Sequence, residues 1–292
     1  MEFRLARKDD MLDIAYMLCI CFNESMDSVK FYLDNKFKLD RCTVCVIDDR
    51  VVSSLSMLET DIYINRKQEK ANYIYAAATL PQYRSKGCMG KLIKYSCDMA
   101  LKRQEKYSTL LPAKSDLYGY YERFGYESFF KIKFVKISNQ EMKNCIFENN
   151  EQDVYNLLKE KTDLYKLINN ICKNINGSII WSEESINYAI SSNYHYGGNT
   201  LYVSNGYAIC FVDNKNCVHV IEFMCEKGSI KKLLQEIYKS YPEMDYKFRL
   251  PVDTDILNFK GEVKPFGMIK KLSDNDNSLD DCKYPYLGLP LD

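Results

Sequence analysis

The stretch that decides the fold runs from Ala76 to Leu92 and reads AAATLPQYRSKGCMGKL. Its first residues continue the run NYIYAAATL, whose apolar and aromatic residues are typical of a strand that ends at Pro81. A short turn follows, and the pattern from Gly87 onward predicts a helix. Strand, glycine-containing turn and helix in this order indicate the centre of an α/β fold.

The start of this predicted helix is suited to hold an anion. Backbone N–H groups at a helix start have no partner within the helix, and the helix dipole adds partial positive charge. Gly87 has no Cβ, so an anion can come close to the backbone. Arg84 and Lys86 add positive charge, and an arginine can hold a phosphate through two hydrogen bonds. The residues alone predict a pyrophosphate site, without saying which pyrophosphate.

Strand and helix patterns alternate through the rest of the first half, as in an α/β protein. Apolar residues at helical spacing predict helices over 9–22, 25–37, 87–104 and 115–125. Strand patterns cover 2–6, 43–65, 72–80, 107–113 and 126–137, and 43–65 is predicted to be a hairpin that turns at Asp48-Asp49-Arg50.

The second half repeats this order more loosely and predicts a second, degenerate copy of the same fold. Helices are predicted over 149–171, 182–193 and 228–240, and strands over 201–225 and 245–251, with an Asn205-Gly206 hairpin turn. A chain of 292 residues also reaches the roughly 250–300 residues at which one hydrophobic core stops growing. We therefore expect two domains, residues 1–137 and 138–292.

Composition excludes several classes of protein. The chain carries 40 basic and 40 acidic residues, which argues against a nucleic-acid binder. No apolar run approaches the roughly 18 residues of a membrane span, and the polar start lacks a signal peptide, so we expect a cytoplasmic protein with reduced cysteines and no membrane partner. Cys42 and Cys45 have metal-site spacing, but on a strand their side chains would point to opposite faces, so no metal is predicted.

Two motifs taken together indicate a family. Arg84-x-x-Gly87-x-x-Gly90 after a strand, followed by Tyr121-Glu-Arg-Phe-Gly125-Tyr126, resembles the GNAT superfamily of acetyltransferases. Within it the chain looks most like the enhanced-intracellular-survival-type branch, which pairs a catalytic GNAT domain with a second GNAT-like domain. The resemblance implies a mixed, mostly antiparallel sheet flanked by helices. The printed chain ends where that branch continues into a sterol-carrier-like domain.

The resemblance also implies a set of site residues. The family binds the pantetheine arm of acetyl-CoA with backbone groups that fall here on Ala77, Ala78 and Thr79. Its pyrophosphate would be bound by the loop amides of Arg84, Ser85, Lys86, Gly87, Cys88, Met89 and Gly90, where Met89 replaces a small residue.

Tyr121 matches the family's general acid. A phenol with a pKa near 10 stays protonated at neutral pH and can donate a proton to the departing thiolate. Tyr118 and Tyr120 remain alternatives, and a packed aromatic with no catalytic role is the structural alternative for Tyr121.

The general base is left open by the sequence. Glu59 and Asp61 are candidates that are more typical of solvent-facing positions, and the carboxylate of Asp292 is a third because the branch brings its terminal carboxylate to the active site. Glu222, Glu226 and Glu236 are interpreted as a solvated face, with attraction of a polycationic substrate as the alternative.

The function expected from the resemblance is direct transfer of an acetyl group from acetyl-CoA to a primary amine of a small molecule or peptide. A homo-oligomer is compatible with the sequence. Two alternatives stay open: a non-catalytic acyl-CoA-binding regulatory or scaffold protein, and a tandem GNAT fold that uses another donor for myristoyl or aminoacyl transfer.

Overall fold

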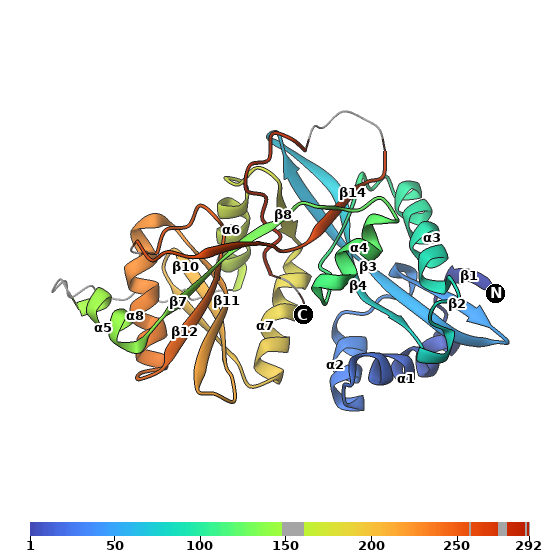
Figure 1. The fold of residues 1–292 in the computed structure, drawn as a ribbon, viewed down its shortest axis with the longest axis horizontal. Coiled ribbons are helices and arrows are strands. Elements are labelled where there is room, and N and C mark those ends of the chain that lie inside the picture. The colour runs from blue at the N-terminus through green and yellow to red at the C-terminus, as the bar shows by residue number, and fades with distance from the viewer. Residues whose placement is uncertain (148–160, 257, 274–278, 290, 292) are drawn as a thin grey trace.

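The computed structural model describes residues 1–147, 161–256, 258–273, 279–289 and 291. Within these ranges no helix has both the length and the apolar character that a bilayer crossing needs. The chain forms two β-sheets with helices on their faces, so the predicted α/β class with a mixed sheet is confirmed (Figure 1).

The helices agree with the sequence pattern to within a few residues at their ends. An additional helix, α5, lies where none was predicted, and the part of the predicted 149–171 helix before residue 161 lies outside the described residues. The helices are α1 (Met11–Phe22), α2 (Met26–Asn35), α3 (Cys88–Lys102), α4 (Tyr118–Glu122), α5 (Asn139–Phe147), α6 (Lys161–Cys172), α7 (Glu183–His195) and α8 (Ile230–Ser240).

Most strands also follow the predicted pattern, and three short ones, β8, β13 and β14, were not predicted. The strands are β1 (Glu2–Leu5), β2 (Cys42–Ile47), β3 (Arg50–Ile64), β4 (Lys67–Thr79), β5 (Tyr107–Leu110), β6 (Glu127–Ser128), β7 (Lys131–Ile137), β8 (Ser178–Trp181), β9 (Asn199–Val203), β10 (Gly206–Val212), β11 (Cys217–Cys225), β12 (Asp245–Leu250), β13 (Glu262–Pro265) and β14 (Met268–Lys271).

The first sheet has the order β1-β2-β3-β4-β5-β14-β6, and β8 pairs with the far end of β3. All pairs are antiparallel except β4 with β5, which are connected through α3. Alternate residues of β3 point to opposite faces: Leu55 and Met57 pack with α3, whereas Leu58 packs in the larger core with α1 and α2. The sheet is therefore enclosed between α3 and the α1–α2 pair.

The second sheet repeats part of this arrangement. Its order is β13-β7-β12-β11-β10-β9, with β9, β10 and β11 antiparallel and β12 parallel to β11 after the crossover through α8. The same succession, three antiparallel strands, a helix and a parallel strand, occurs in β2, β3, β4, α3 and β5 of the first sheet.

The two sheets exchange strands. β7 pairs with β12 and β13 in the second sheet, although it directly follows β6 of the first. In return β14, near the end of the chain, lies between β5 and β6 in the first sheet. The division at residues 137 and 138 stays a prediction, because each half contributes a strand to the other's sheet.

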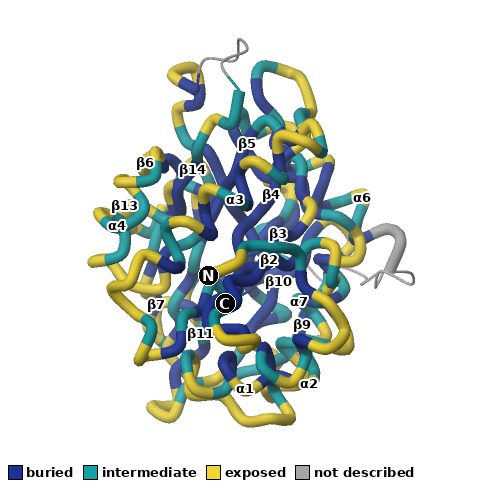
Figure 2. Tube along the Cα trace, turned by 90° about the vertical axis from the view of Figure 1, so that its right-hand side faces the viewer, coloured by how far each residue is buried: buried dark blue, intermediate teal, exposed yellow. Residues whose placement is uncertain are grey.

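The C-terminal segment is docked where the halves meet. Trp181 Nε1 donates to the carbonyl oxygen of Leu287 at 3.0 Å, and Ile179 N donates to that of Tyr286 at 2.9 Å. Leu289 and Leu291 are also buried. In Figure 2 the central strands are mostly buried, while exposed residues gather on outer loops and helices. The tail is therefore part of the core.

Candidate active site

A bulge in β4 is the first feature of the site. Ser54 pairs with Ala78 and Ser56 pairs with Tyr75, so two residues of β4, Ala76 and Ala77, lie opposite a single residue of β3. Ala76 has φ = +50°, in the left-handed region that glycine tolerates better than alanine. Such a bulge bends its strand and breaks the regular ladder of hydrogen bonds.

Beyond the bulge β4 loses its partner. The parallel pairing with β5 runs only from Ala71 and Tyr107 to Ile74 and Leu110, where β5 ends. Residues 75–79 therefore have a strand edge that β5 does not cover. An extended ligand arm can add to such an edge through backbone hydrogen bonds, which fits the role predicted for Ala77, Ala78 and Thr79.

Some polar groups of this edge already have partners. The Ala78 carbonyl oxygen accepts a hydrogen bond from Ser53 Oγ at 2.9 Å. The Thr79 carbonyl oxygen accepts from Arg84 Nε at 3.1 Å and from Cys21 Sγ at 3.3 Å. Of the three predicted pantetheine residues, Ala78 and Thr79 therefore have carbonyls that already accept hydrogen bonds, one at Ala78 and two at Thr79.

The loop after β4 turns its backbone into the start of α3. Ser85 has φ = +61° and Gly87 has φ = +78°, so two left-handed residues shape the turn. Gly87 is the N-cap, and the first backbone hydrogen bond of the helix is donated by Lys91 N to Gly87 O at 3.1 Å. The N–H groups of Cys88, Met89 and Gly90 therefore lie at a 15-residue helix start without intrahelical acceptors.

Gly87, Cys88 and Gly90 have different roles in the loop. A Cβ on Gly87 would meet nothing within 4 Å, so the space in front of this amide is open. A Cβ on Gly90 would lie 2.8 Å from the Phe124 ring, so this glycine lets α3 pack closely on the segment after α4. The Cys88 side chain is buried with Cys45 and Val52. It can offer its backbone but not a nucleophilic thiol.

Tyr121 lies on α4, in the same apolar cluster as Ala77 and Met89. Its half-buried ring packs edge-on against Tyr120 and Tyr126, with centroids 5.3 and 6.0 Å away. Burial raises the pKa of Tyr121 to about 12. Within the described chain its hydroxyl makes no hydrogen bond. The phenol is thus protonated at neutral pH and free to donate.

The two neighbouring tyrosines are placed differently. The Tyr118 hydroxyl accepts a hydrogen bond from Gly267 N at 3.1 Å and so ties α4 to the segment that precedes β14. The Tyr120 ring lies under the Arg123 guanidinium, 4.8 Å from its centroid. Both tyrosines therefore have structural contacts of their own, and the assignment of Tyr121 as the proton donor stays a prediction.

Two of the three carboxylates considered as general base, Glu59 and Asp61, lie away from the bulge. Glu59 forms an ion pair with Arg41, and Asp61 accepts a hydrogen bond from Gln68 at 2.7 Å. Their partners on β4 are Asn72 and Lys70, five and seven residues before Ala77, or roughly 16–23 Å along a strand. Neither can reach the bulge. Asp292 lies outside the described residues.

The interpretation of Glu222 as part of a solvated face is wrong. Its side chain is buried and accepts hydrogen bonds from Tyr207, Tyr286 and the backbone of Leu289. Glu226 is exposed, and Glu236 is half-buried beside Lys239. The three glutamates therefore do not form one surface.

A row of aromatic side chains that the sequence analysis missed joins the halves beside the bulge. Tyr75 meets Tyr32 edge-on at 5.3 Å, and Tyr32 lies 6.4 Å from Tyr188 of α7. Phe31 stacks on His195 at 4.4 Å. No local pattern could have revealed this row, because its members come from α2, β4 and α7.

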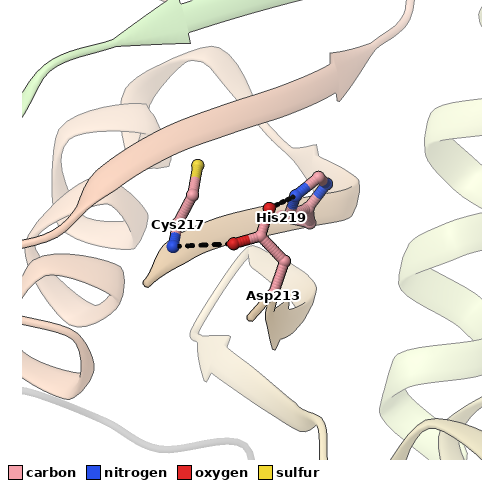
Figure 3. Close-up of side chains that lie close together, drawn as sticks. All are labelled: Asp213, Cys217 and His219. Carbon is pink, nitrogen blue, oxygen red and sulfur yellow. Dashed lines mark hydrogen bonds and ion pairs between the residues drawn. The ribbon is translucent and has the colours of Figure 1, made fainter. Parts of the chain in front are cut away.

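A group with metal-ligating atoms lies in the second half, away from these residues (Figure 3). Ligand atoms of Asp213, Cys217 and His219 lie within 4.8 Å of one another. Asp213 Oδ2 is 2.8 Å from His219 Nε2 and 3.5 Å from Lys247 Nζ. Asp213 also accepts from the backbone N–H of Lys215 and Cys217, so the group closes the β10–β11 turn, and Lys247 already supplies positive charge to it. The sequence analysis predicted no metal and did not single out this group.

Residues 2–129 match the family described as "Acetyltransferase (GNAT) domain". This segment therefore belongs to the GNAT acetyltransferases, and the chain is an enzyme of the acyltransferase class. The match covers β1 to Phe129 and includes the bulge, the loop and Tyr121. No curated protein matches the chain.

Solved structures extend the likeness of fold over both halves. A GCN5-related N-acetyltransferase from Anabaena variabilis is 14% identical with a TM-score of 0.78, covering 93% of this chain and 73% of that one. A probable N-acyltransferase of unknown function from Enterococcus faecalis is 15% identical, with a TM-score of 0.74 and coverage of 93% and 72%. Eis1 from Mycobacterium abscessus is 9% identical, with a TM-score of 0.72 and coverage of 94% and 74%.

Proposed function

We propose that the chain transfers an acetyl group from acetyl-CoA to a primary amine of a small molecule or peptide by direct attack. The observation that carries this proposal is the succession of bulge, uncovered strand edge and helix start from Ala76 to Gly90. The edge can bind an extended arm, and the helix start can bind a diphosphate at its end. Coenzyme A has these two parts in this order.

The residues of the site divide the work of binding. Backbone groups of Ala77, Ala78 and Thr79 would hold the pantetheine arm, and the backbone from Arg84 to Gly90 would hold the diphosphate. Arg84 and Lys86 are exposed and add positive charge beside these amides. The open space in front of Gly87 leaves room for the diphosphate oxygens.

The transfer needs one proton donor and one proton acceptor. The amine nitrogen forms a bond to the acyl carbon, the carbon–sulfur bond breaks, and the departing thiolate takes the proton of the Tyr121 hydroxyl. The raised pKa of Tyr121 keeps that proton in place until the thiolate forms. The proton lost by the amine goes to a base, for which we propose the carboxylate of Asp292.

The base assignment has its own test. A peptide tag added after Asp292 should lower kcat, because it removes the terminal carboxylate and crowds the docked tail. The same tag placed before Met1 is the matched control. Equal, full activity of the two tagged proteins would eliminate the terminal carboxylate of the chain as the base.

We also propose a reducing compartment, the cytoplasm, as the place of action. All twelve cysteines are free thiols in the structure, and eight of them are buried where they act as small apolar side chains.

The decisive experiment measures product formation directly. The purified chain is incubated with acetyl-CoA and a panel of primary amines, and free coenzyme A is separated by chromatography, because the protein's own thiols would react with a thiol reagent. Amine-dependent release of coenzyme A supports acetyl transfer. Tight binding without release would instead support a non-catalytic acyl-CoA-binding protein. Turnover with a longer acyl or an aminoacyl donor alone would assign a different donor.

A further inference from the structure

Glu222 occupies a special position in β11. Ile209 pairs with Glu222 and Cys210 pairs with Val220, so Ile221 is an extra residue on β11 and forms a bulge. Parallel pairing of β11 with β12 stops at Val220, before Glu222. In the first sheet, Ala78 likewise follows a bulge and lies beyond the parallel pairing with β5. Glu222 is thus the counterpart of a residue in the proposed acetyl-CoA slot.

The C-terminal segment lies at this open end of the second sheet. Lys131 N, just before the part of β7 that pairs with β12, donates to Pro285 O at 3.1 Å. A few residues further on, Leu289 N donates to Glu222 Oε2 at 3.1 Å. The segment therefore touches both β7 and β11 where β12 no longer separates them.

Three donors converge on the Glu222 carboxylate, and two of them belong to this segment. Tyr286 Oη donates to Oε2 at 3.0 Å, and Tyr207 Oη, from β10, donates to Oε1 at 3.1 Å. Leu289 N is the third. Three donors suit an ionised carboxylate, which can only accept.

The surroundings of Glu222 make these bonds important. Burial raises the pKa of this carboxyl, while the three hydrogen bonds and the positive charge of Arg249 on β12 favour the ionised form. Cys172 of α6 faces the same space and is itself buried. A buried carboxylate whose donors are removed would lose most of its stabilisation, so the segment and Glu222 hold each other in place.

We propose that Glu222 is a positioning residue whose carboxylate fixes residues 286–289 and thereby sets where the end of the chain lies during acetyl transfer. The first part stands on the contacts alone. The second rests on the proposed function, in which the end of the chain supplies the base. No substrate contact by Glu222 is involved.

The test compares two tyrosines that each donate one hydrogen bond to the same carboxylate. Tyr286→Phe removes a bond from the segment, whereas Tyr207→Phe removes a bond from β10 and leaves the segment attached. Glu222→Gln removes the negative charge and leaves one acceptor oxygen where three donors converge. Glu226→Gln, which alters an exposed carboxylate on the residue after β11, is the control. Each variant is assayed for amide hydrogen exchange of 286–289, for melting temperature, and for kcat and KM with acetyl-CoA.

The expected result separates the variants. Glu222→Gln and Tyr286→Phe should speed exchange in 286–289 by about tenfold and lower kcat by a similar factor, with KM for acetyl-CoA unchanged. Tyr207→Phe should lower the melting temperature as much as Tyr286→Phe does, yet leave exchange and kcat near those of the unaltered protein. Glu226→Gln should change nothing.

Three results would overturn the inference or its parts. Unchanged exchange in Tyr286→Phe would show that Glu222 does not fix the segment. An equal loss of kcat in Tyr286→Phe and Tyr207→Phe would show that Glu222 has a purely structural role. If the unaltered chain transfers no acetyl group, the proposed function fails, and the exchange data still decide whether Glu222 is the anchor. The tyrosine pair keeps the test decisive even if Glu222→Gln does not fold.

Discussion

At Gly87 the backbone is left-handed, with φ = +78°, and the space beyond the missing Cβ is open. A side chain at this position would strain the backbone without contacting a neighbouring residue. A substitution should therefore weaken ligand binding by moving the loop amides, and it should not disturb the packing of the core.

Gly87→Val should weaken acetyl-CoA binding by about tenfold or more, because a left-handed L-residue costs roughly 1–2 kcal/mol and a β-branched one more. Isothermal titration calorimetry measures the change in Kd. Gly228→Ala is the matched control, since a Cβ there also meets nothing within 4 Å and its φ is not left-handed. Equal Kd values for the two variants would remove the loop from the site.

Tyr121→Phe should lower kcat by about 10²–10³, within the range of general acid catalysis, with little change in the Kd of acetyl-CoA. Tyr120→Phe, the adjacent residue on α4, should keep kcat within a factor of about two. An unaltered kcat in Tyr121→Phe would assign the acid to another group.

The pH dependence follows from the raised pKa of Tyr121, about 12. A proton donor works while it is protonated, so its contribution to kcat is present below that pKa and is lost as the pH rises through it. We expect no fall in kcat from this group up to about pH 10 in the kcat–pH profile. A loss of activity centred near pH 8 that Tyr121→Phe abolishes would contradict this.

Among the elements, the bulge of β4 is where alanine takes a conformation that glycine prefers. Ala76→Gly should leave the free energy of unfolding almost unchanged, because relief of the left-handed strain offsets the added flexibility of the unfolded chain. Ala76→Val should destabilise the fold by about 2 kcal/mol and weaken acetyl-CoA binding. Chemical denaturation and calorimetry measure the two effects. Equal stability of both variants would argue against strain at this residue.

Most helices and strands could be predicted from the sequence because their residue patterns are local. Helical and alternating spacing predicted α1, α3 and the β2–β3 hairpin, and the turn before Gly87 predicted the start of α3. The bulge could not be found in this way, since it depends on which residue of β3 lies opposite each residue of β4. Glu222 was misread for the same reason: its three donors lie 15, 64 and 67 residues away in the chain.

For the whole molecule, the exchange of β7 and β14 joins the halves into one structure. β14 has only four residues, MIKK, and nothing in so short a run shows that it pairs with β5 and β6 more than 130 residues earlier. Local signals therefore could not show that each half contributes a strand to the other's sheet. A strand exchanged in each direction means that neither half is complete on its own.

Met268→Asp tests this dependence. Met268 is fully buried in the first sheet beside α3, so the charge should destabilise the fold by more than about 4 kcal/mol and abolish acetyl-CoA binding. Val263→Asp, on the exposed edge strand β13, is the control and should change the free energy of unfolding by less than about 0.5 kcal/mol. Urea denaturation compares the two. Retained binding in Met268→Asp would show that the first sheet does not need β14.

The position of β14 has a consequence for how the protein matures. A ribosome delivers the first half of the chain first, but its sheet has a vacant place between β5 and β6 until Met268–Lys271 has left the exit tunnel. The facing edges of β5 and β6 therefore stay unpaired until the ribosome has synthesised nearly all of the second half of the chain. A pause or premature stop late in the message would leave the half that was made first unable to close.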